Sequence, residues 1–149
     1  MNDSPLRTVS MTRGNVDKVY GLEKESFAFP WSKRSFYEEL DNELAFYELL
    51  EQDERAIAYA GMWIMFDEAH VTKIAVAKDM RGNGFGKVMM NHMISLAKEK
   101  GVTRMTLEVR EHNTVAQRLY ESLGFVVCGV RKRYYTDTGE NGIIMWADI

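Results

Sequence analysis

Residues 79–87 of this chain read DMRGNGFGK, a glycine-rich stretch with Arg81 near its start and Lys87 at its end. The apolar segment HVTKIAVA (70–77) before it predicts a strand, and residues 85–101 after it have the spacing of an amphipathic helix. A glycine-rich turn between a strand and a helix directs backbone N–H groups and the positive end of the helix dipole at one anion. The first interpretation is therefore a phosphate-binding loop, and the alternative is a strand–helix turn that binds nothing.

Two common nucleotide-binding motifs do not fit this loop. Its glycines (Gly82, Gly84 and Gly86) alternate with single residues, so the dinucleotide fingerprint G-x-G-x-x-G is not matched. The NTPase motif G-x-x-x-x-G-K-[ST] fails at Val88, which stands where a magnesium-binding hydroxyl is required. The glycine spacing alone therefore does not identify the ligand.

The composition predicts one globular domain over residues 1–149. The chain is 46% hydrophobic and 28% charged, which suits a single ordinary core. The formal net charge of -3 argues against broad binding to nucleic-acid phosphates. No apolar run approaches the roughly 20 residues that a membrane span needs. We expect a protein without direct nucleic-acid or membrane binding.

The N-terminus and the single cysteine indicate the compartment. Residues 1–10 lack the basic and apolar stretches of a secretion signal. Cys128 is the only cysteine, so an intrachain disulfide is impossible and a reducing cytoplasm is expected. The histidines (His70, His92 and His112) have no ligand-like spacing among themselves or with Cys128, and we interpret them as ordinary surface or strand-end residues. We expect no metal site.

Hydrophobic periodicity and turn residues predict the other elements. The expected strands cover 6–11, 45–51, 56–66, 70–77, 103–110, 125–130 and 142–147, and the expected helices cover 16–25, 33–42, 85–100 and 114–123. Thr12 or Asn15 is a candidate cap for the first helix, Ser32 for the second, and Thr114 with Gln117 forms a capping box for the last. The order predicts one α+β domain in which strand 103–110 lies parallel to strand 70–77.

The glycine loop also resembles a known signature. A strand, then [Q/R]-x-x-G-x-G/A, then a helix is similar to the GNAT superfamily of N-acetyltransferases, and RGNGFG at 81–86 fits that signature residue for residue. The resemblance implies a mixed, mostly antiparallel sheet of about six or seven strands flanked by about four helices, with a splayed parallel pair at the cofactor site. It also implies acetyl-CoA as cosubstrate, bound through its diphosphate without a metal. The implied cofactor-binding residues are Ile74, Ala75, Val76, Arg81, Gly82, Asn83, Gly84, Phe85, Gly86, Lys87 and Asn113.

A closer resemblance extends beyond the loop. FAFPWS at 27–32, LEVREHNTVAQRLYESLGF at 107–125 and RKRYYTDTGENGIIM at 131–145 are similar to the bacterial family that acetylates the N-terminal alanine of a ribosomal protein. The resemblance implies a protein substrate that presents its N-terminal peptide, the eighteenth small-subunit ribosomal protein.

The chemistry of amide formation fits two residues. An α-amine, with a pKa of about 7.7–8.0, is partly neutral near pH 7, so a modest base suffices. Glu108 on the polar face of strand 103–110 is the candidate base, and an exposed glutamate or a partner of Arg110 is the alternative. Tyr120 is the candidate acid because a phenol can protonate a leaving thiolate, although its spacing also suits a core aromatic.

Aromatic side chains are the candidates for the acceptor site. Phe29, Pro30 and Trp31 and the pair Tyr134–Tyr135 are expected to wall a groove for an extended peptide, unless they are only loop packing. Two other functions stay open: acetylation of a lysine or small amine, and a non-catalytic coenzyme-A-binding module. Cys128 lies in an apolar strand without an adjacent histidine, so direct transfer is favoured over an acyl-cysteine.

Overall fold

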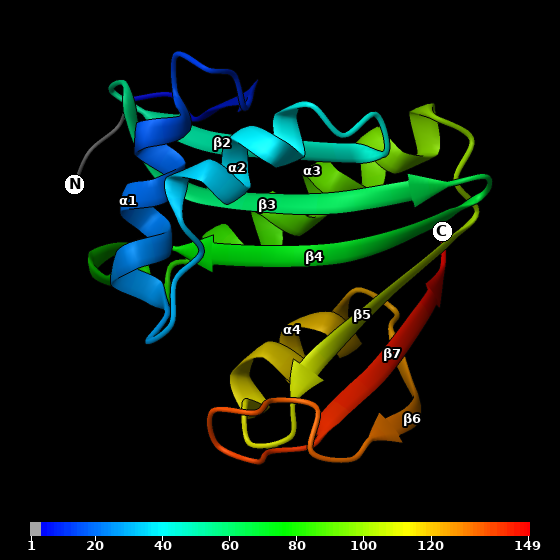
Figure 1. Ribbon diagram of the computed structural model, residues 1–149. Coiled ribbons are helices and arrows are strands. Elements are labelled where there is room, and N and C mark those ends of the chain that lie inside the picture. Colours follow the sequence, from blue (N-terminus) through cyan, green and yellow to red (C-terminus); the bar gives the residue numbers. More distant parts are fainter. Residues whose placement is uncertain (1–3) are drawn as a thin grey trace.

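The computed structural model describes residues 4–149, which form one seven-stranded sheet with helices on both faces (Figure 1). The strands are β1 (Arg7–Ser10), β2 (Ala45–Gln52), β3 (Arg55–Met65), β4 (Glu68–Val76), β5 (Arg104–Arg110), β6 (Val126–Arg131) and β7 (Gly142–Asp148). The helices are α1 (Val16–Ser26), α2 (Lys33–Leu40), α3 (Phe85–Glu99) and α4 (Thr114–Ser122), with a short 3-10 turn η1 (Lys78–Met80). Residues 1–3, part of the segment in which no secretion signal is expected, lie outside the described residues.

The sheet runs in the order β1-β2-β3-β4-β5-β7-β6, and β4–β5 is its parallel neighbour pair. Parallel neighbours need a crossover, and α3 provides it. The other neighbours are antiparallel, including the three-strand meander β2–β3–β4. The predicted α+β class and the predicted parallel pair are both confirmed.

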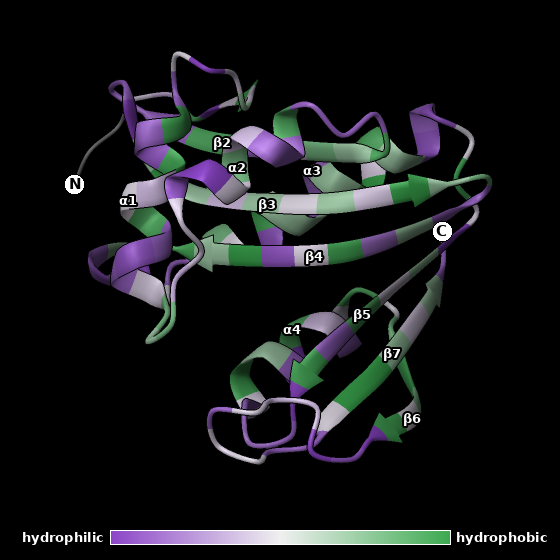
Figure 2. Cartoon of the chain, in the orientation of Figure 1, coloured by the Kyte–Doolittle hydropathy of each residue, from purple (hydrophilic) through white to green (hydrophobic). Residues whose placement is uncertain are grey.

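Two apolar cores lie on opposite faces of the sheet. The helices α1 and α2 cover β2–β4 on one face, where Val19, Phe36 and Tyr59 are fully buried, whereas α3 and α4 lie behind the sheet in Figure 1. Met89 and Met93 of α3 are also fully buried, as expected from their spacing. Figure 2 shows long apolar runs along β3 and β7, and a mostly polar α2. Burial of these stripes, rather than helix propensity, holds the helices in place.

The starts of α2 and α4 follow local capping rules, with a correction at α4. Ser32 caps α2 as predicted, since its side chain accepts from the Ser35 amide at 3.2 Å. The capping box at Thr114 is wrong: Asn113 is the N-cap of α4, and its side chain accepts from the Ala116 amide at 3.1 Å. Asn is as good a cap as Thr, so the two neighbours compete and the sequence pattern cannot separate them.

The start of α1 also departs from expectation, because the predicted cap residue is in place but does not bond to the helix. Asn15 stands at the N-cap position of α1 but makes no capping bond to the helix. Its side chain accepts from the Thr12 amide at 2.7 Å and donates to the Ser10 carbonyl at 3.0 Å, so it stabilises the turn before the helix. None of the helices within residues 4–149 combines the length and hydrophobicity that a membrane span requires.

Candidate active site

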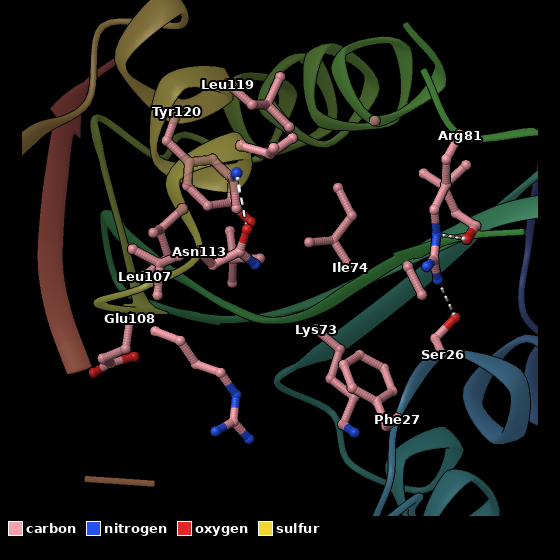
Figure 3. A pocket seen from close by; sticks show the side chains of 18 of the residues that line it. Ser26, Phe27, Lys73, Ile74, Arg81, Leu107, Glu108, Asn113, Leu119 and Tyr120 are labelled. Atoms are coloured by element: carbon pink, nitrogen blue, oxygen red, sulfur yellow. Dashed lines mark hydrogen bonds between the residues drawn. The ribbon is translucent and has the colours of Figure 1, made fainter. Parts of the chain in front are cut away.

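A large cavity lies where β4 and β5 separate. The two strands pair over three positions, of which the last is His70 with Thr106, and then diverge. A cavity of about 950 Å³ opens between them, lined by Thr72–Val76 of β4, Leu107–Arg110 of β5 and the start of α4. Figure 3 shows Glu108 and Tyr120 at one end of this cavity and Arg81 with Ser26 at the other. The separation exposes strand backbone that an extended ligand can reach.

The glycine loop closes the far end of the cavity with free amides. Gly82 and Gly84 have φ of 80° and 82°, the left-handed region that glycine adopts without strain. Val88 directly follows the loop, and its backbone amide donates to the Gly84 carbonyl at 3.1 Å. The amides of residues 82–87 make no hydrogen bond within residues 4–149. Together with the helix dipole of α3, they suit a diphosphate.

The two basic residues of the loop behave differently. Arg81 binds the protein, because its Nε donates to the Val76 carbonyl at 3.0 Å and its Nη2 donates to Ser26 Oγ at 3.3 Å. Arg81 thus ties the loop to β4 and to α1, whereas Lys87 is exposed on the cavity wall. Asn83 does not line the cavity; its side-chain Nδ2 donates to the Met80 carbonyl at 3.0 Å and shapes the loop. Ser26 was not a sequence candidate.

The remaining predicted cofactor residues gather along the same cavity. Ile74, Ala75 and Val76 form the β4 wall, and Asn113 lies at the start of α4. Within residues 4–149 no group of three His, Cys, Asp or Glu side chains is arranged to hold a metal ion. The cavity therefore offers backbone, amides and apolar surface, which are the groups that an extended phosphorylated thioester such as acetyl-CoA requires.

Tyr120 is buried but opens on the cavity. Its exposed fraction is 5%, it packs against the Phe125 ring, and its hydroxyl has no hydrogen-bond partner within residues 4–149. Burial raises the pKa of Tyr120 well above its ordinary value, so the phenol stays protonated at neutral pH. The ring is therefore a core aromatic, as its spacing suggested, and the residue also lines the cavity; its role as an acid stays a prediction.

Glu108 is held by two cationic or polar partners. Its Oε2 lies 2.6 Å from Nε2 of His70, and its Oε1 lies 3.3 Å from Nε of Arg131. The hydrogen bond from His70 is the main reason that the pKa of Glu108 is lowered, and Arg131 adds to it against the cost of burial. The alternative that Glu108 pairs with Arg110 is wrong, because Arg110 pairs with Asp137 and Glu140 instead.

A second hollow of about 280 Å³ meets the cavity at Glu108. Its walls are mostly aromatic. They comprise Trp31, Trp63, His70, Val71, Thr72, Glu108, Tyr134 and Tyr135. Four of these residues (Val71, Thr72, Glu108 and Tyr135) also line the large cavity. One compartment therefore adjoins the other across Glu108, which is the arrangement that a transfer between two substrates needs.

The aromatic acceptor candidates divide between these two compartments. Trp31, Tyr134 and Tyr135 wall the second hollow, and burial raises the pKa of Tyr135 to about 12. Phe29 is 75% exposed and lines the large cavity, whereas Pro30 lines neither. Trp63, from β3, is a wall residue that sequence analysis missed, because only the sheet brings β3 beside the loop that carries Trp31.

A buried charged cluster holds this loop on the sheet. Glu23 of α1 is fully buried and accepts three hydrogen bonds: from the Trp31 amide at 2.7 Å, from the Tyr59 hydroxyl, and from Lys73 Nζ at 2.6 Å. The Lys73 ammonium lies 4.5 Å from the centre of the Phe27 ring and 4.3 Å from that of Trp31. The cluster fixes residues 27–31 beside the mouth of the cavity.

Comparison with known proteins agrees with this geometry. The model of the acetyltransferase (GNAT) family matches residues 16–125. A Bacillus subtilis protein provisionally named a ribosomal protein bS18-alanine N-acetyltransferase is 43% identical over 141 residues, covering 94% of this chain and 93% of that protein. The Escherichia coli bS18-alanine N-acetyltransferase is 35% identical over 138 residues, covering 91% of this chain and 93% of that protein.

A solved structure of the Escherichia coli ribosomal protein alanine N-acetyltransferase superposes with a TM-score of 0.90 at 34% identity, covering 97% of this chain and 94% of that one. The splayed strands, the amide-lined loop and the extent of these matches define one class of protein. This chain belongs to the GNAT family of acetyltransferases. Enzymes of this family use acetyl-CoA as the acetyl donor, and the large cavity has the groups to hold it.

Proposed function

We propose that this enzyme acetylates the N-terminal α-amine of a protein, and that its substrate is the N-terminal alanine of ribosomal protein bS18. The full-length similarity to proteins named for that reaction supports the substrate. The single structural observation that carries the proposal is the position of Glu108, on the wall shared by the acetyl-CoA cavity and the aromatic hollow. A peptide N-terminus in the hollow reaches the acetyl group beside this carboxylate.

The electrostatics of the site favour an α-amine over a lysine. The pKa of Glu108 is lowered, so its carboxylate is a weak proton acceptor. An α-amine has a pKa of about 7.7–8.0 and is already partly neutral at pH 7, whereas a lysine amine near 10.4 is neutral only about once in a thousand molecules. A weak base is enough to deprotonate an α-amine but is a poor match for a lysine amine.

The acid and the base act in one direct transfer. The neutral amine attacks the thioester carbonyl, Glu108 provides the general base, and Tyr120 gives its hydroxyl proton to the departing coenzyme A thiolate. The raised pKa of Tyr120 keeps that proton in place until the thiolate forms. The site residues for acetyl-CoA are the β4 backbone at Ile74–Val76, the amides of residues 82–87, and Asn113. A newly made ribosomal protein places the reaction in the cytoplasm.

The substrate is tested with matched peptides. A peptide that copies the N-terminus of bS18 from the same organism should be acetylated, and the same peptide with a blocked α-amine but an added lysine should not. Mass spectrometry of N-termini from cells with and without the gene then tests the natural target. Acetylation of the blocked peptide at an equal rate would contradict the proposal.

The two catalytic roles are tested by substitution with matched controls. Glu108→Gln and Tyr120→Phe should each lower the rate by about 100-fold or more while leaving the affinity for acetyl-CoA unchanged. Glu121→Gln on the exposed face of α4 and Tyr37→Phe on α2 are chemically identical changes outside the site, and both should keep the wild-type rate. Full activity in both catalytic variants would show that these roles are misassigned.

A further inference from the structure

His70 forms a pair with Glu108 at the mouth of the parallel strands. It lies on β4 at the last paired position before β4 and β5 diverge, and its Nε2 is 2.6 Å from Glu108 Oε2. The His70 side chain is 38% exposed, whereas that of Glu108 is 9% exposed. The imidazole thus connects a nearly buried carboxylate with the aromatic hollow and with solvent.

The partners of Glu108 determine which nitrogen of His70 carries the proton. Arg131 lies on the other carboxylate oxygen at 3.3 Å, which favours the ionised form of Glu108. An ionised carboxylate can only accept, so Nε2 of His70 must be the donor at 2.6 Å. A neutral imidazole with a protonated Nε2 has a lone pair on Nδ1, and no partner occupies that nitrogen within residues 4–149.

Within residues 4–149, the ion pair of this imidazole is with Glu108. Glu108 of β5 and, through it, Arg131 of β6 are the ionic neighbours. The loop between β6 and β7 contributes the phenols of Tyr134 and Tyr135 to the same hollow, and β3 contributes Trp63, whose indole donates to Glu39 of α2. The ring is therefore oriented by one carboxylate, and the hollow that it lines is mostly aromatic.

We propose that His70 is a further catalytic residue, whose Nδ1 takes the proton of the acceptor amine while Glu108 holds and polarises the ring. This inference rests on the proposed acetylation of an α-amine. It refines the basic role proposed above for Glu108: each oxygen of that carboxylate already has a partner, so His70 takes the proton and Glu108 acts through the imidazole. A carboxylate that orients a histidine base is a recurrent arrangement in hydrolases.

The proton and electron balance is complete within the site. The amine nitrogen forms its bond to the acetyl carbon, the C–S bond breaks, and the electron pair of that bond leaves on the sulfur. The amine proton, directly or through one water, goes to Nδ1 of His70, and the hydroxyl proton of Tyr120 goes to the sulfur. Afterwards His70 releases its proton to solvent and Tyr120 takes one up, so the enzyme returns to its first state.

The decisive variant is His70→Gln, because glutamine keeps an N–H donor for Glu108 but has no basic nitrogen. The acetylation rate at about pH 7 should fall by 100-fold or more, with the KM for acetyl-CoA unchanged, and the loss should shrink as hydroxide replaces the base at higher pH. His92→Gln is the matched control, since His92 forms a similar pair with Glu48 at 2.8 Å on the α3 side. A His70→Gln rate within about twofold of wild type across the pH range would overturn the proposal.

A second measurement does not depend on turnover. ¹⁵N NMR of the wild-type enzyme at about pH 8 should show His70 protonated at Nε2 and unprotonated at Nδ1. Glu108→Gln should remove this tautomer preference and leave the His92 signals unchanged. A proton on Nδ1 in the wild type would overturn the proposal. Absence of peptide acetylation by the wild type would instead contradict the proposed function. The tautomer measurement would then still show whether Nδ1 of His70 is unprotonated.

Discussion

The buried Glu23 cluster gives a sharp test of how the acceptor loop is held. Glu23→Gln keeps the size of the side chain and can still accept from the Trp31 amide, but it removes the negative charge beside Lys73. The Lys73 side chain is 12% exposed, and burial already lowers its pKa. Leaving one charge of a buried pair without its partner costs about 3–5 kcal/mol of unfolding free energy.

The expected size can be converted into a melting temperature. For 149 residues the unfolding entropy is about 0.3 kcal/mol/K, so the loss corresponds to a fall of roughly 10–16 °C in Tm. Because the folded-state pKa of Lys73 is below its unfolded value, the unfolded chain binds more protons, and stability rises with pH as Lys73 becomes neutral. Glu23→Gln should therefore regain part of its Tm toward about pH 10.

Scanning calorimetry on three variants measures this effect. The double variant Glu23→Gln with Lys73→Met should be within about 1 kcal/mol of wild type, because both charges are gone and the thioether still packs on the aromatic rings. The single variant should also raise the KM for the peptide, since the Trp31 loop loses its anchor. A single-variant loss under about 1 kcal/mol, or strictly additive effects of the two substitutions, would refute the reasoning.

Four further predictions concern single positions. Gly84→Ala, at a φ of 82°, should lower the unfolding free energy by about 1–2 kcal/mol. It should also weaken the binding of acetyl-CoA, which titration calorimetry measures. Gly61→Ala should cost about 1–3 kcal/mol, because the added methyl group would overlap the Tyr47 ring. Cys128→Ala should keep the turnover rate, since direct transfer uses no acyl-cysteine. The pKa of Glu108 is lowered in the folded protein, so the ionised carboxylate stabilises the fold above about pH 4.3. This stabilisation is lost as the pH falls through the folded-state pKa. Glu108→Gln should therefore reduce the dependence of the unfolding free energy on pH in this acidic range.

The glycine substitutions have a matched control, and each of the four predictions has an outcome that would contradict it. Gly21→Ala in the middle of α1, where an added methyl group meets open space, should be neutral or stabilising and shows what the same change does in a helix. Unchanged acetyl-CoA affinity in Gly84→Ala, wild-type stability in Gly61→Ala, loss of turnover in Cys128→Ala, or an unaltered acid transition in Glu108→Gln would each contradict its prediction.

Local sequence patterns predicted the fold well. The strands and helices fall within a few residues of the expected ranges, since alternation and helical spacing follow directly from which side chains face the core. Helix α2 ends at Leu40 rather than two residues later. The cap of α4 was misplaced by one residue, because Asn113 and Thr114 can both cap and the choice depends on side-chain direction.

The candidate site was predicted only in part. Motif context led to the glycine loop, Glu108 and Tyr120, all of which line one cavity. The same reasoning treated His70 as an ordinary strand-end residue, although it lies 2.6 Å from Glu108 across a separation of 38 residues. Lys73 and Glu23, 50 residues apart, form the buried pair beside the acceptor loop. No local pattern connects residues so distant in the chain.

The sequence by itself determined the elements, the anion-binding loop and the type of chemistry, because periodicity, glycine conformation and side-chain pKa are properties of short segments. Only the tertiary structure decided that Glu108 separates two compartments, and that His70 and Arg131 hold its carboxylate. These features depend on where β4 and β5 stop pairing. That position is a matter of strand register, which pairs His70 with Thr106 across 36 residues of chain and cannot be read from either segment alone.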